Sequence, residues 1–283
     1  MNGPAFAPSP RGAVGKKFDW PYPGPGEGIS LHNHSTWSDG AADAETMCRA
    51  AKAAGLRVFG LSDHYTIHPD FGAVDWSLPR KRAEAYCAEM DRLKKLLSDD
   101  RFTLLAGLEV DFFPENCEEV FALLENCPLD YLIGSVHYAG KFPIDCSARH
   151  WEALSGPETD AVCRLYWEKL RMAAECGKFA FLGHLDLPKK FGNLRGRGDF
   201  LREAERVLDA AAATRTAIEL NTSGWFKPCA EPYPAPAMLR AAAARHIPVV
   251  VNADAHRPED VTRAFPEARE LLLQAGFPAP KPV

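Results

Sequence analysis

The sequence contains no long apolar run. No stretch approaches the roughly 18 consecutive apolar residues of a membrane-spanning helix, and the N-terminus lacks the uninterrupted apolar segment of a signal peptide. Basic residues are not in excess either, because 33 Lys and Arg stand against 38 Asp and Glu, giving a net charge of −5. These absences count against a membrane protein and against nucleic acid as the main partner, but they are compatible with a local basic pocket for a small anion.

Closely spaced cysteines are also missing. The eight cysteines are scattered along the chain and form no Cys-x-x-Cys motif. This distribution is typical of the reduced thiols of a cytoplasmic protein. We therefore expect a soluble protein of the cytoplasm, and the sequence leaves its oligomeric state open.

The composition predicts one globular domain preceded by an arm. Residues 1–28 are rich in Pro and Gly and show no hydrophobic period, so we interpret them as a tail or a packed N-terminal arm. The rest of the chain, 29–283, contains no linker and no low-complexity segment. Its length and the hydrophobic content of 46% allow a core of the size found in a barrel domain.

From residue 29 onward, short apolar runs alternate with segments of helical spacing. The runs predict seven strands, at 29–34, 58–62, 103–110, 131–137, 179–185, 217–221 and 248–252. The helices are expected near 43–54, 80–97, 115–126, 158–176, 199–213, with Asp199 as the N-cap, 235–245 and 260–275. Strict alternation predicts a parallel sheet covered by helices. We favour a closed TIM-barrel-like (β/α)7 barrel over an open doubly wound sheet, because polar residues follow every strand rather than one switch point.

These polar residues share one position, the C-terminal end of a predicted strand. Six of the nine histidines occur there, accompanied by Asp, Glu and Asn. The groups are His32, His34 and Asp39; Asp63 and His64; Glu109 and Asp111; His137; His184 and Asp186; Glu219 and Asn221; and Asp254 and His256. The C-terminal ends of barrel strands meet on one face, so we expect these side chains to converge on a single site.

Imidazole and carboxylate groups without thiolates suit Zn, Mn or Fe. Nine of the strand-end residues are candidate ligands, which is too many for one ion. At four or five ligands per ion, with bridging carboxylates, they would bind two or three divalent ions. The other three histidines, His68, His150 and His246, are expected at the surface.

The motifs resemble those of the polymerase-and-histidinol-phosphatase (PHP) family, and within it the histidinol-phosphatase branch. The likeness spans about residues 29–265 and includes His32-x-His34, Ser62-Asp63-His64, Gly107-Leu108-Glu109-Val110-Asp111, Gly134-Ser135-Val136-His137-Tyr138, Pro143-Ile144-Asp145, Gly183-His184-Leu185-Asp186, Glu219-Leu220-Asn221-Thr222-Ser223-Gly224 and Asp254-Ala255-His256. One departure is Asp39, because close phosphatase relatives can have a histidine at this position. Aspartate also ligates metals, so the site is retained.

The resemblance implies a distorted seven-stranded barrel with its active site at the C-terminal ends of the strands and a trinuclear metal centre. It assigns three ligand sets, with Glu109 shared: His32, His34, Glu109 and Asp254 for the first ion; Asp39, His64 and His256 for the second; and Glu109, His137 and His184 for the third.

The implied activity is metal-dependent hydrolysis of a small-molecule phosphate monoester, with L-histidinol phosphate of histidine biosynthesis as the substrate. In this hypothesis a metal-bridging hydroxide attacks phosphorus, and Asp254, Glu109 and His256 are the catalytic residues. Arg164 and Arg257 are candidates for binding the phosphate, and the long loop after His137 would recognise the organic part of the substrate.

Two other classes of function stay open. A PHP-family phosphoesterase acting on nucleotides or nucleic-acid ends would use the same ligands, but the acidic pI of about 6.0 and the absence of interleaved basic and aromatic residues count against it. A non-enzymatic protein with a decayed site is the other, and the presence of every implied ligand counts against that.

Overall fold

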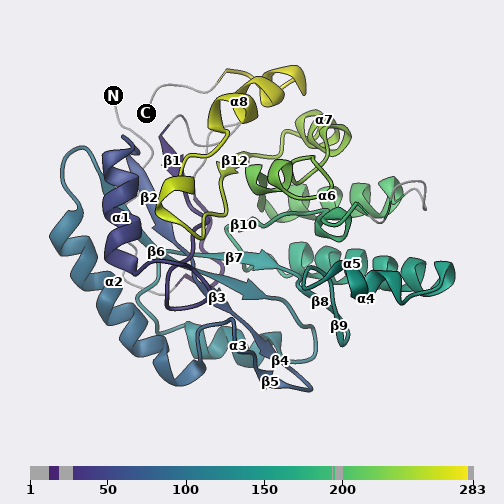
Figure 1. Ribbon diagram of the computed structural model, residues 1–283, viewed down its shortest axis with the longest axis horizontal. Coiled ribbons are helices and arrows are strands. Elements are labelled where there is room, and N and C mark those ends of the chain that lie inside the picture. Colours follow the sequence, from purple (N-terminus) through teal and green to yellow (C-terminus); the bar gives the residue numbers. More distant parts are fainter. Residues whose placement is uncertain (1–12, 19–27, 193, 195–199, 280–283) are drawn as a thin grey trace.

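Parallel strands form the framework of the molecule. The computed structural model describes residues 13–18, 28–192, 194 and 200–279. Seven strands lie side by side in the order β1 (Ile29–Ser30), β2 (Val58–Leu61), β6 (Thr103–Asp111), β7 (Tyr131–Ser135), β10 (Phe181–Leu182), β11 (Ala217–Asn221) and β12 (Val249–Asn252). Every neighbouring pair is parallel. The predicted seven-stranded parallel barrel is therefore confirmed (Figure 1).

The barrel is nearly closed by contacts between the first and last strands. No ladder joins β1 to β12 among the described residues, but just beyond them Asn33 and Ala255 form a parallel bridge. The amide of His34 donates to the carbonyl of Ala255 at 2.9 Å. The amide of Leu31 donates to Asn252 Oδ1 at 2.6 Å. This seam places the segment that carries His32 and His34 beside the one that carries Asp254 and His256.

A break in the second strand adds to the distortion of the barrel. Pairing along β6 stops after Leu61 and resumes with β3 (His64–Tyr65), where His64 stands opposite Glu109. The amide of Glu109 donates to the carbonyls of Ser62 and Asp63, at 3.1 and 3.2 Å, within the break. Two residues that the sequence analysis assigned to different strand ends thus lie directly opposite each other.

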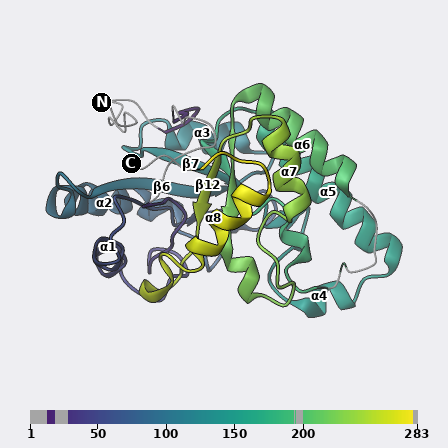
Figure 2. The same ribbon diagram turned by 90° about the horizontal axis from the view of Figure 1, so that it is seen from above.

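Helices surround the strands (Figure 2). They are α1 (Ala44–Ala53), α2 (Ala83–Leu97), α3 (Cys117–Leu124), α4 (Ala148–Glu152), α5 (Gly156–Glu175), α6 (Leu201–Thr214), α7 (Pro236–Ala244) and α8 (Phe265–Gln274). Local sequence explains where two of them begin. Asp43 caps α1 by accepting from the amide of Thr46 at 2.7 Å, and Ser155 with Glu158 forms a capping box at the start of α5. None of the helices of the described part is both long and apolar enough to cross a bilayer.

The start of α8, the loop after His137 and the start of α6 can each be compared with the sequence prediction. The helix predicted from 260 begins only at Phe265, because Ala264 has a left-handed backbone (φ 57°) that cannot continue a helix from the preceding turn. The long loop after His137 contains a hairpin and α4. Asp199, the expected N-cap of α6, lies outside the described residues, and α6 begins at Leu201.

Short elements lie in the loops. Two antiparallel hairpins, β4 (Ile67–His68) with β5 (Gly72–Ala73) and β8 (Tyr138–Ala139) with β9 (Phe142–Pro143), follow β3 and β7. The described residues also contain the 3-10 helices η1 (Arg80–Arg82), η2 (Leu187–Lys189), η3 (Thr222–Phe226) and η4 (Pro258–Asp260). Both hairpins follow strands at their C-terminal ends, so they can border a site on that face.

Apolar side chains fill the lower part of the barrel. The interior cluster is Ile29, Leu31, Val58, Leu105, Tyr131, Ile133, Ala180, Phe181, Ala217 and Val250. The Tyr131 side chain lies over Gly60 and Gly107. A Cβ atom at Gly60 would come within 2.1 Å of its hydroxyl oxygen, and one at Gly107 within 2.3 Å of its ring. Its hydroxyl donates to the carbonyl of Leu31 at 2.6 Å. This packed layer forms an apolar base beneath the polar groups at the strand ends.

Candidate metal centre

Glu109 is the centre of the cluster at the barrel mouth. It points inward from β6 and is 1% exposed. Nitrogens of five imidazoles lie within 3.7 Å of its two carboxylate oxygens: His64 at 2.7 Å, His184 at 2.8 Å, His32 at 3.2 Å, His137 at 3.5 Å and His34 at 3.7 Å. A buried carboxylate requires a compensating partner, such as a protonated imidazole or a bound cation.

Two further carboxylates, Asp254 and Asp39, contact three of these imidazoles and the sixth, His256. Asp254 Oδ1 lies 3.1 Å from His34 Nε2 and 3.7 Å from His32 Nε2. Asp39 Oδ1 lies 3.3 Å from His256 Nε2 and 3.6 Å from His64 Nε2. The structure therefore brings all nine candidate ligands into one continuous cluster.

The ligand atoms fall into four overlapping groups, each with its members within 4.8 Å of one another. The groups are His34, Asp39, His64 and His256; His32, His34 and Asp254; His32, Glu109 and His184; and His64, Glu109 and His137. They overlap the three sets implied by the family likeness without reproducing them. Glu109 is not grouped with Asp254, His137 and His184 fall into separate groups, and His34 also belongs to the group around Asp39.

Electrostatics in the cluster favour bound cations. Burial by itself would raise the pKa of the Glu109 and Asp254 carboxyls, but the surrounding imidazoles outweigh it and hold both pKa values well below the usual range. Burial opposes protonation of His137, yet Asp111 and Glu109 outweigh it and raise the pKa of His137 to about 10. The carboxylates therefore remain ionised and draw positive charge into the site.

Several buried polar atoms of the cluster lack a hydrogen-bond partner among the described residues, which indicates whether the cluster fits metal ions. His32 Nε2, His64 Nδ1 and Glu109 Oε2 are buried and form no hydrogen bond within the described structure, although both nitrogens lie within 3.2 Å of that oxygen. Buried polar groups without a hydrogen bond are costly in proteins. Because these atoms lie close together and lack hydrogen bonds, as ligands of a shared ion would, the residues fit a metal centre.

An outer layer of carboxylates and amides orients the inner residues. Glu219 Oε1 lies 2.8 Å from His32 Nδ1, while its Oε2 accepts from the His184 amide at 2.9 Å. Asp111 does the same for His137, since Oδ1 accepts from its amide at 2.7 Å and Oδ2 lies 3.3 Å from its Nδ1. Such partners fix the ring orientation of a metal-binding histidine. The sequence analysis placed Glu219 and Asp111 at strand ends but assigned neither this role.

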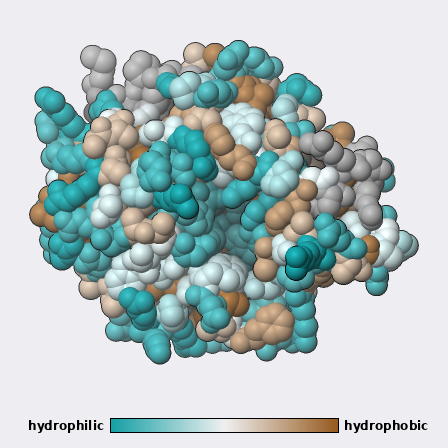
Figure 3. Space-filling model, viewed as in Figure 1, coloured by the Kyte–Doolittle hydropathy of each residue, from teal (hydrophilic) through white to brown (hydrophobic). Residues whose placement is uncertain are grey.

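A cavity of 590 Å³ opens directly above the cluster. Figure 3 shows a hollow on this face, lined largely by hydrophilic residues. Six of the nine candidate ligands line the cavity: Asp39, His64, His137, His184, Asp254 and His256. Four cations, Lys190, Lys227, Arg257 and Arg263, line it as well. A small anionic molecule could therefore contact the cluster and positive side chains at the same time.

The cations differ in their availability. Lys190 pairs with Asp145 at 3.0 Å, and Arg263 pairs with Asp260 at 3.0 Å. Lys227 and Arg257 have no carboxylate partner within the ranges that the structure describes. The sequence analysis identified Arg257 but missed Lys227, which lies in the loop after η3 and carries no motif.

Arg164 occupies a different place. It lies in the middle of α5, mostly exposed, with its guanidinium 3.6 Å from Asp160, and it does not line the cavity. Arg164, which the sequence analysis named as a candidate for binding the phosphate, therefore lies away from the cavity. We do not propose a role for it in phosphate binding.

His68 was also misjudged. It is 1% exposed, with its ring stacked on Phe71 at 4.0 Å and its Nε2 3.0 Å from the carbonyl of Gly140. This contact joins the two hairpins. His150 and His246 are exposed, as expected.

Fold and site together define an α/β barrel with a cluster of potential metal ligands at its mouth. The model of the PHP domain family matches residues 30–223, and the chain belongs to this family. A protein of Deinococcus radiodurans named "Probable histidinol-phosphatase" is 36% identical over 228 residues, which cover 81% of this chain and 85% of that protein.

Two other proteins resemble this chain in different ways, one over the whole fold and one over a part of its own length. The histidinol phosphate phosphatase of Lactococcus lactis, solved with zinc, L-histidinol and phosphate, has a TM-score of 0.71 at 22% identity and shares the fold over 89% of this chain and 95% of that chain. The DNA polymerase/3'-5' exonuclease PolX of Bacillus subtilis is 25% identical over 240 residues, which are 81% of this chain but 34% of that protein.

We predict that Glu219→Gln weakens metal binding without unfolding the protein. The substitution removes the negative charge of the carboxylate that lies against His32 Nδ1. Changes to the hydrogen-bond partners of metal-binding histidines typically weaken metal affinity roughly 10–100-fold. Competition with a graded series of chelators, followed by elemental analysis, measures the change. Glu118→Gln, an exposed change on α3, is the control and should leave the affinity unaltered. Equal affinities for the two variants would contradict the orienting role.

Proposed function

We propose that this protein is a metal-dependent phosphomonoesterase that hydrolyses L-histidinol phosphate to L-histidinol and phosphate in histidine biosynthesis. The observation that carries the proposal is the complete cluster of six imidazoles and three carboxylates in a chain 36% identical to the D. radiodurans protein. The L. lactis enzyme of the same fold, crystallised with zinc and the two products of that reaction, supports the choice of substrate. A cytoplasmic location is part of the proposal, and the eight free cysteines are consistent with it.

The nine cluster residues would hold two or three divalent ions of Zn, Mn or Fe. Following the family likeness, we assign His32, His34, Glu109 and Asp254 to the first ion, Asp39, His64 and His256 to the second, and Glu109, His137 and His184 to the third. When bound, such ions neutralise charge on phosphoryl oxygens and make a nearby water more acidic. The short distances from Glu109 to imidazoles of all three sets support a shared, bridging carboxylate.

Asp254 is suited to move the proton. Its side chain is 16% exposed and lines the cavity, while Asn221 Nδ2 donates to its Oδ2 at 3.1 Å. The neighbouring imidazoles keep its pKa well below the usual range, so the carboxylate is ionised at neutral pH. In the proposed reaction the Asp254 carboxylate takes the proton of the attacking water and returns it to the departing alcohol oxygen. Glu109 and His256 would act in the reaction as ligands of the metal ions.

Arg257 and Lys227 are placed to bind the phosphate. Both line the cavity beside the cluster, and Arg257 directly follows His256. A guanidinium can form two parallel hydrogen bonds with phosphate oxygens. Their positions support recognition of a phosphate ester whose phosphorus lies over the metal cluster.

We predict that the purified protein, loaded with Mn or Zn, turns over L-histidinol phosphate far better than p-nitrophenyl phosphate, nucleotides or an oligonucleotide. Chelation should abolish this activity, and added metal should restore it. The measurement is kcat/KM for phosphate release across the panel. A preference for nucleotides or for oligonucleotide ends would instead support the activity suggested by the likeness to the PolX protein.

A second prediction concerns Arg257. Hydrogen bonds to charged groups contribute about 1.5–3 kcal/mol, so Arg257→Ala should raise KM for the substrate, and Ki for inorganic phosphate, by roughly 10–100-fold. Arg164→Ala is the matched control, since Arg164 lies on the exposed face of α5. If the two variants have the same KM and Ki, Arg257 does not bind phosphate.

A further inference from the structure

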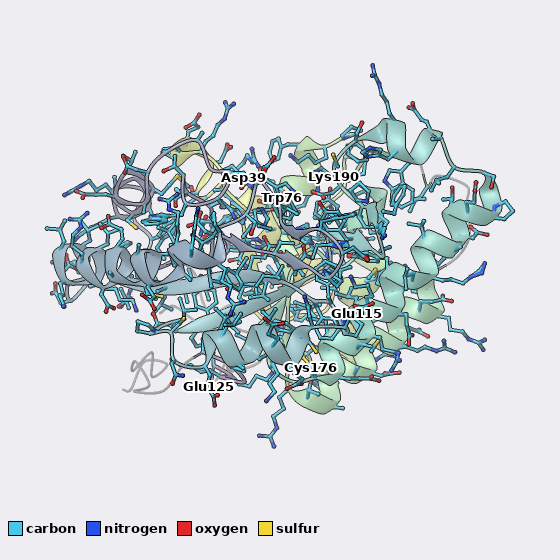
Figure 4. The ribbon with its side chains drawn as sticks, turned by 90° about the horizontal axis from the view of Figure 1, so that it is seen from below. Asp39, Trp76, Glu115, Glu125, Cys176 and Lys190 are labelled. Atoms are coloured by element: carbon cyan, nitrogen blue, oxygen red, sulfur yellow. The ribbon has the colours of Figure 1, made fainter. Side chains whose placement is uncertain are left out.

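Two thiols from different segments meet on the side of the molecule away from the barrel mouth. Cys87 lies on the inner face of α2 and is 4% exposed, whereas Cys127 follows the end of α3 and is half-buried. The two thiols form a hydrogen bond, with Cys87 as the donor. In Figure 4, Glu125, which directly follows α3, lies on the opposite side of the molecule from Asp39 and Lys190, which line the cavity above the cluster.

A second contact holds the same two segments together. Lys94 lies about two helical turns after Cys87, so both side chains are on one face of α2. Lys94 Nζ lies 2.6 Å from Asp130 Oδ2, and Asp130 comes between Cys127 and β7. Asp130 Oδ2 also accepts from the amide of Ala106, on β6, at 2.7 Å. The thiol pair therefore lies in an interface that an ion pair and a contact with the central strand hold in register.

Cys127 has the properties of an attacking thiol. The hydrogen bond from Cys87 lowers the pKa of the Cys127 thiol to about 7. The same bond, together with burial, raises the pKa of the Cys87 thiol well above its usual range. The thiolate is the nucleophilic form of cysteine, and Cys127 is the more exposed of the two. An oxidant from solution thus meets Cys127 first, with Cys87 directly behind it.

The chain between the two cysteines contains the central residue of the metal cluster. It runs from α2 through β6 to α3, and β6 carries Glu109. A covalent bond between Cys87 and Cys127 would close this segment into a loop. Such a bond reduces the conformational freedom of the unfolded chain, so it opposes unfolding of the enclosed segment.

We propose that Cys87 and Cys127 form a reversible disulfide when the protein meets a peroxide, and that this bond clamps the segment that carries Glu109. First, the Cys127 thiolate attacks one oxygen of hydrogen peroxide, the O–O bond breaks and hydroxide leaves, which gives a sulfenic acid. The hydroxide takes up the proton that Cys127 had released. The Cys87 sulfur then attacks the Cys127 sulfur, the S–O bond breaks, and the hydroxyl group leaves with the Cys87 proton as water.

The electrons balance in this sequence. The two thiols together lose two electrons, and one hydrogen peroxide is reduced to two waters. Exchange with a small thiol such as glutathione breaks the disulfide again and returns both cysteines to the reduced form. Disulfides of cytoplasmic proteins are usually transient in this way, so the bond is compatible with the location proposed above.

The test uses zinc-loaded protein, because zinc has no redox chemistry. The protein is incubated with hydrogen peroxide, denatured, alkylated and digested, and peptide mass spectrometry locates each cysteine. We expect most molecules to contain a Cys87–Cys127 bond, which dithiothreitol removes. Cys127→Ser should abolish the bond and leave the buried Cys87 reduced. Cys117→Ser, which removes another half-buried thiol at the start of α3, is the matched control and should form the bond as the wild type does.

Unfolding in urea, followed by circular dichroism, measures the clamp. The oxidised wild type should unfold at a higher urea concentration than the reduced protein, because the bond restricts the unfolded chain. Dithiothreitol should return the midpoint to that of the reduced protein. Peroxide-treated Cys127→Ser should show no such shift.

Three results would overturn the proposal. If neither thiol reacts, or if Cys127 is oxidised to a sulfinic acid while Cys87 stays free, the two cysteines do not act as a pair. A bond from Cys87 to a different cysteine leads to the same conclusion. A protein that contains the Cys87–Cys127 bond but unfolds at the same or a lower urea concentration would refute the clamp.

Discussion

Burial of the Glu109 carboxylate is the constraint on which the rest of the site depends. An isolated ionised carboxylate in a protein interior is strongly disfavoured unless it is paired or coordinates a metal. Here five imidazoles approach it, and the three closest come from three different parts of the barrel: His32 follows β1, His64 begins β3 and His184 follows β10. The barrel therefore provides what a single loop could not, which is a set of imidazoles held around one buried carboxylate.

The strands achieve this by separating apolar from polar side chains along their length. On β6 the inward positions run from Leu105 through Gly107 to Glu109 and Asp111, so one face changes from apolar to acidic towards the mouth. Tyr131 fills the space that the absent side chain of Gly107 leaves, and closes the barrel below the cluster. The outer carboxylates Glu219 and Asp111 then fix imidazoles from behind. Rigid support of this kind is needed to position several ligands at once.

Much of this arrangement could be predicted from the sequence, because it depends on strand periodicity. In a parallel barrel the C-terminal ends of all strands meet, so residues as far apart as His32 and His256 could be assigned to one site without a contact map. The strands also follow from apolar runs, and β11 has the predicted bounds. The ligand groups, in contrast, depend on side-chain directions, and the closeness of His34 to the Asp39 group was not predicted.

Residues in loops were harder to predict because their surroundings come from other segments. His68 was expected at the surface but is buried, because the β8–β9 hairpin packs on it. Arg164 had the charge expected of a phosphate ligand, but its place along α5 directs it elsewhere. Lys227 carries no motif, and only the folded chain reveals that it lines the cavity above the cluster.

The central claim is that Glu109 is shared between metal ions at the barrel mouth. Anomalous diffraction from crystals of the metal-loaded protein, recorded above and below the absorption edge of the bound metal, tests it most directly. The account predicts at least two anomalous peaks at bonding distance, about 2.0–2.2 Å, from Glu109 oxygens, each also bonded to imidazole nitrogens. A protein that binds metal elsewhere, with ordinary hydrogen bonds joining Glu109 to its histidines, would contradict the account.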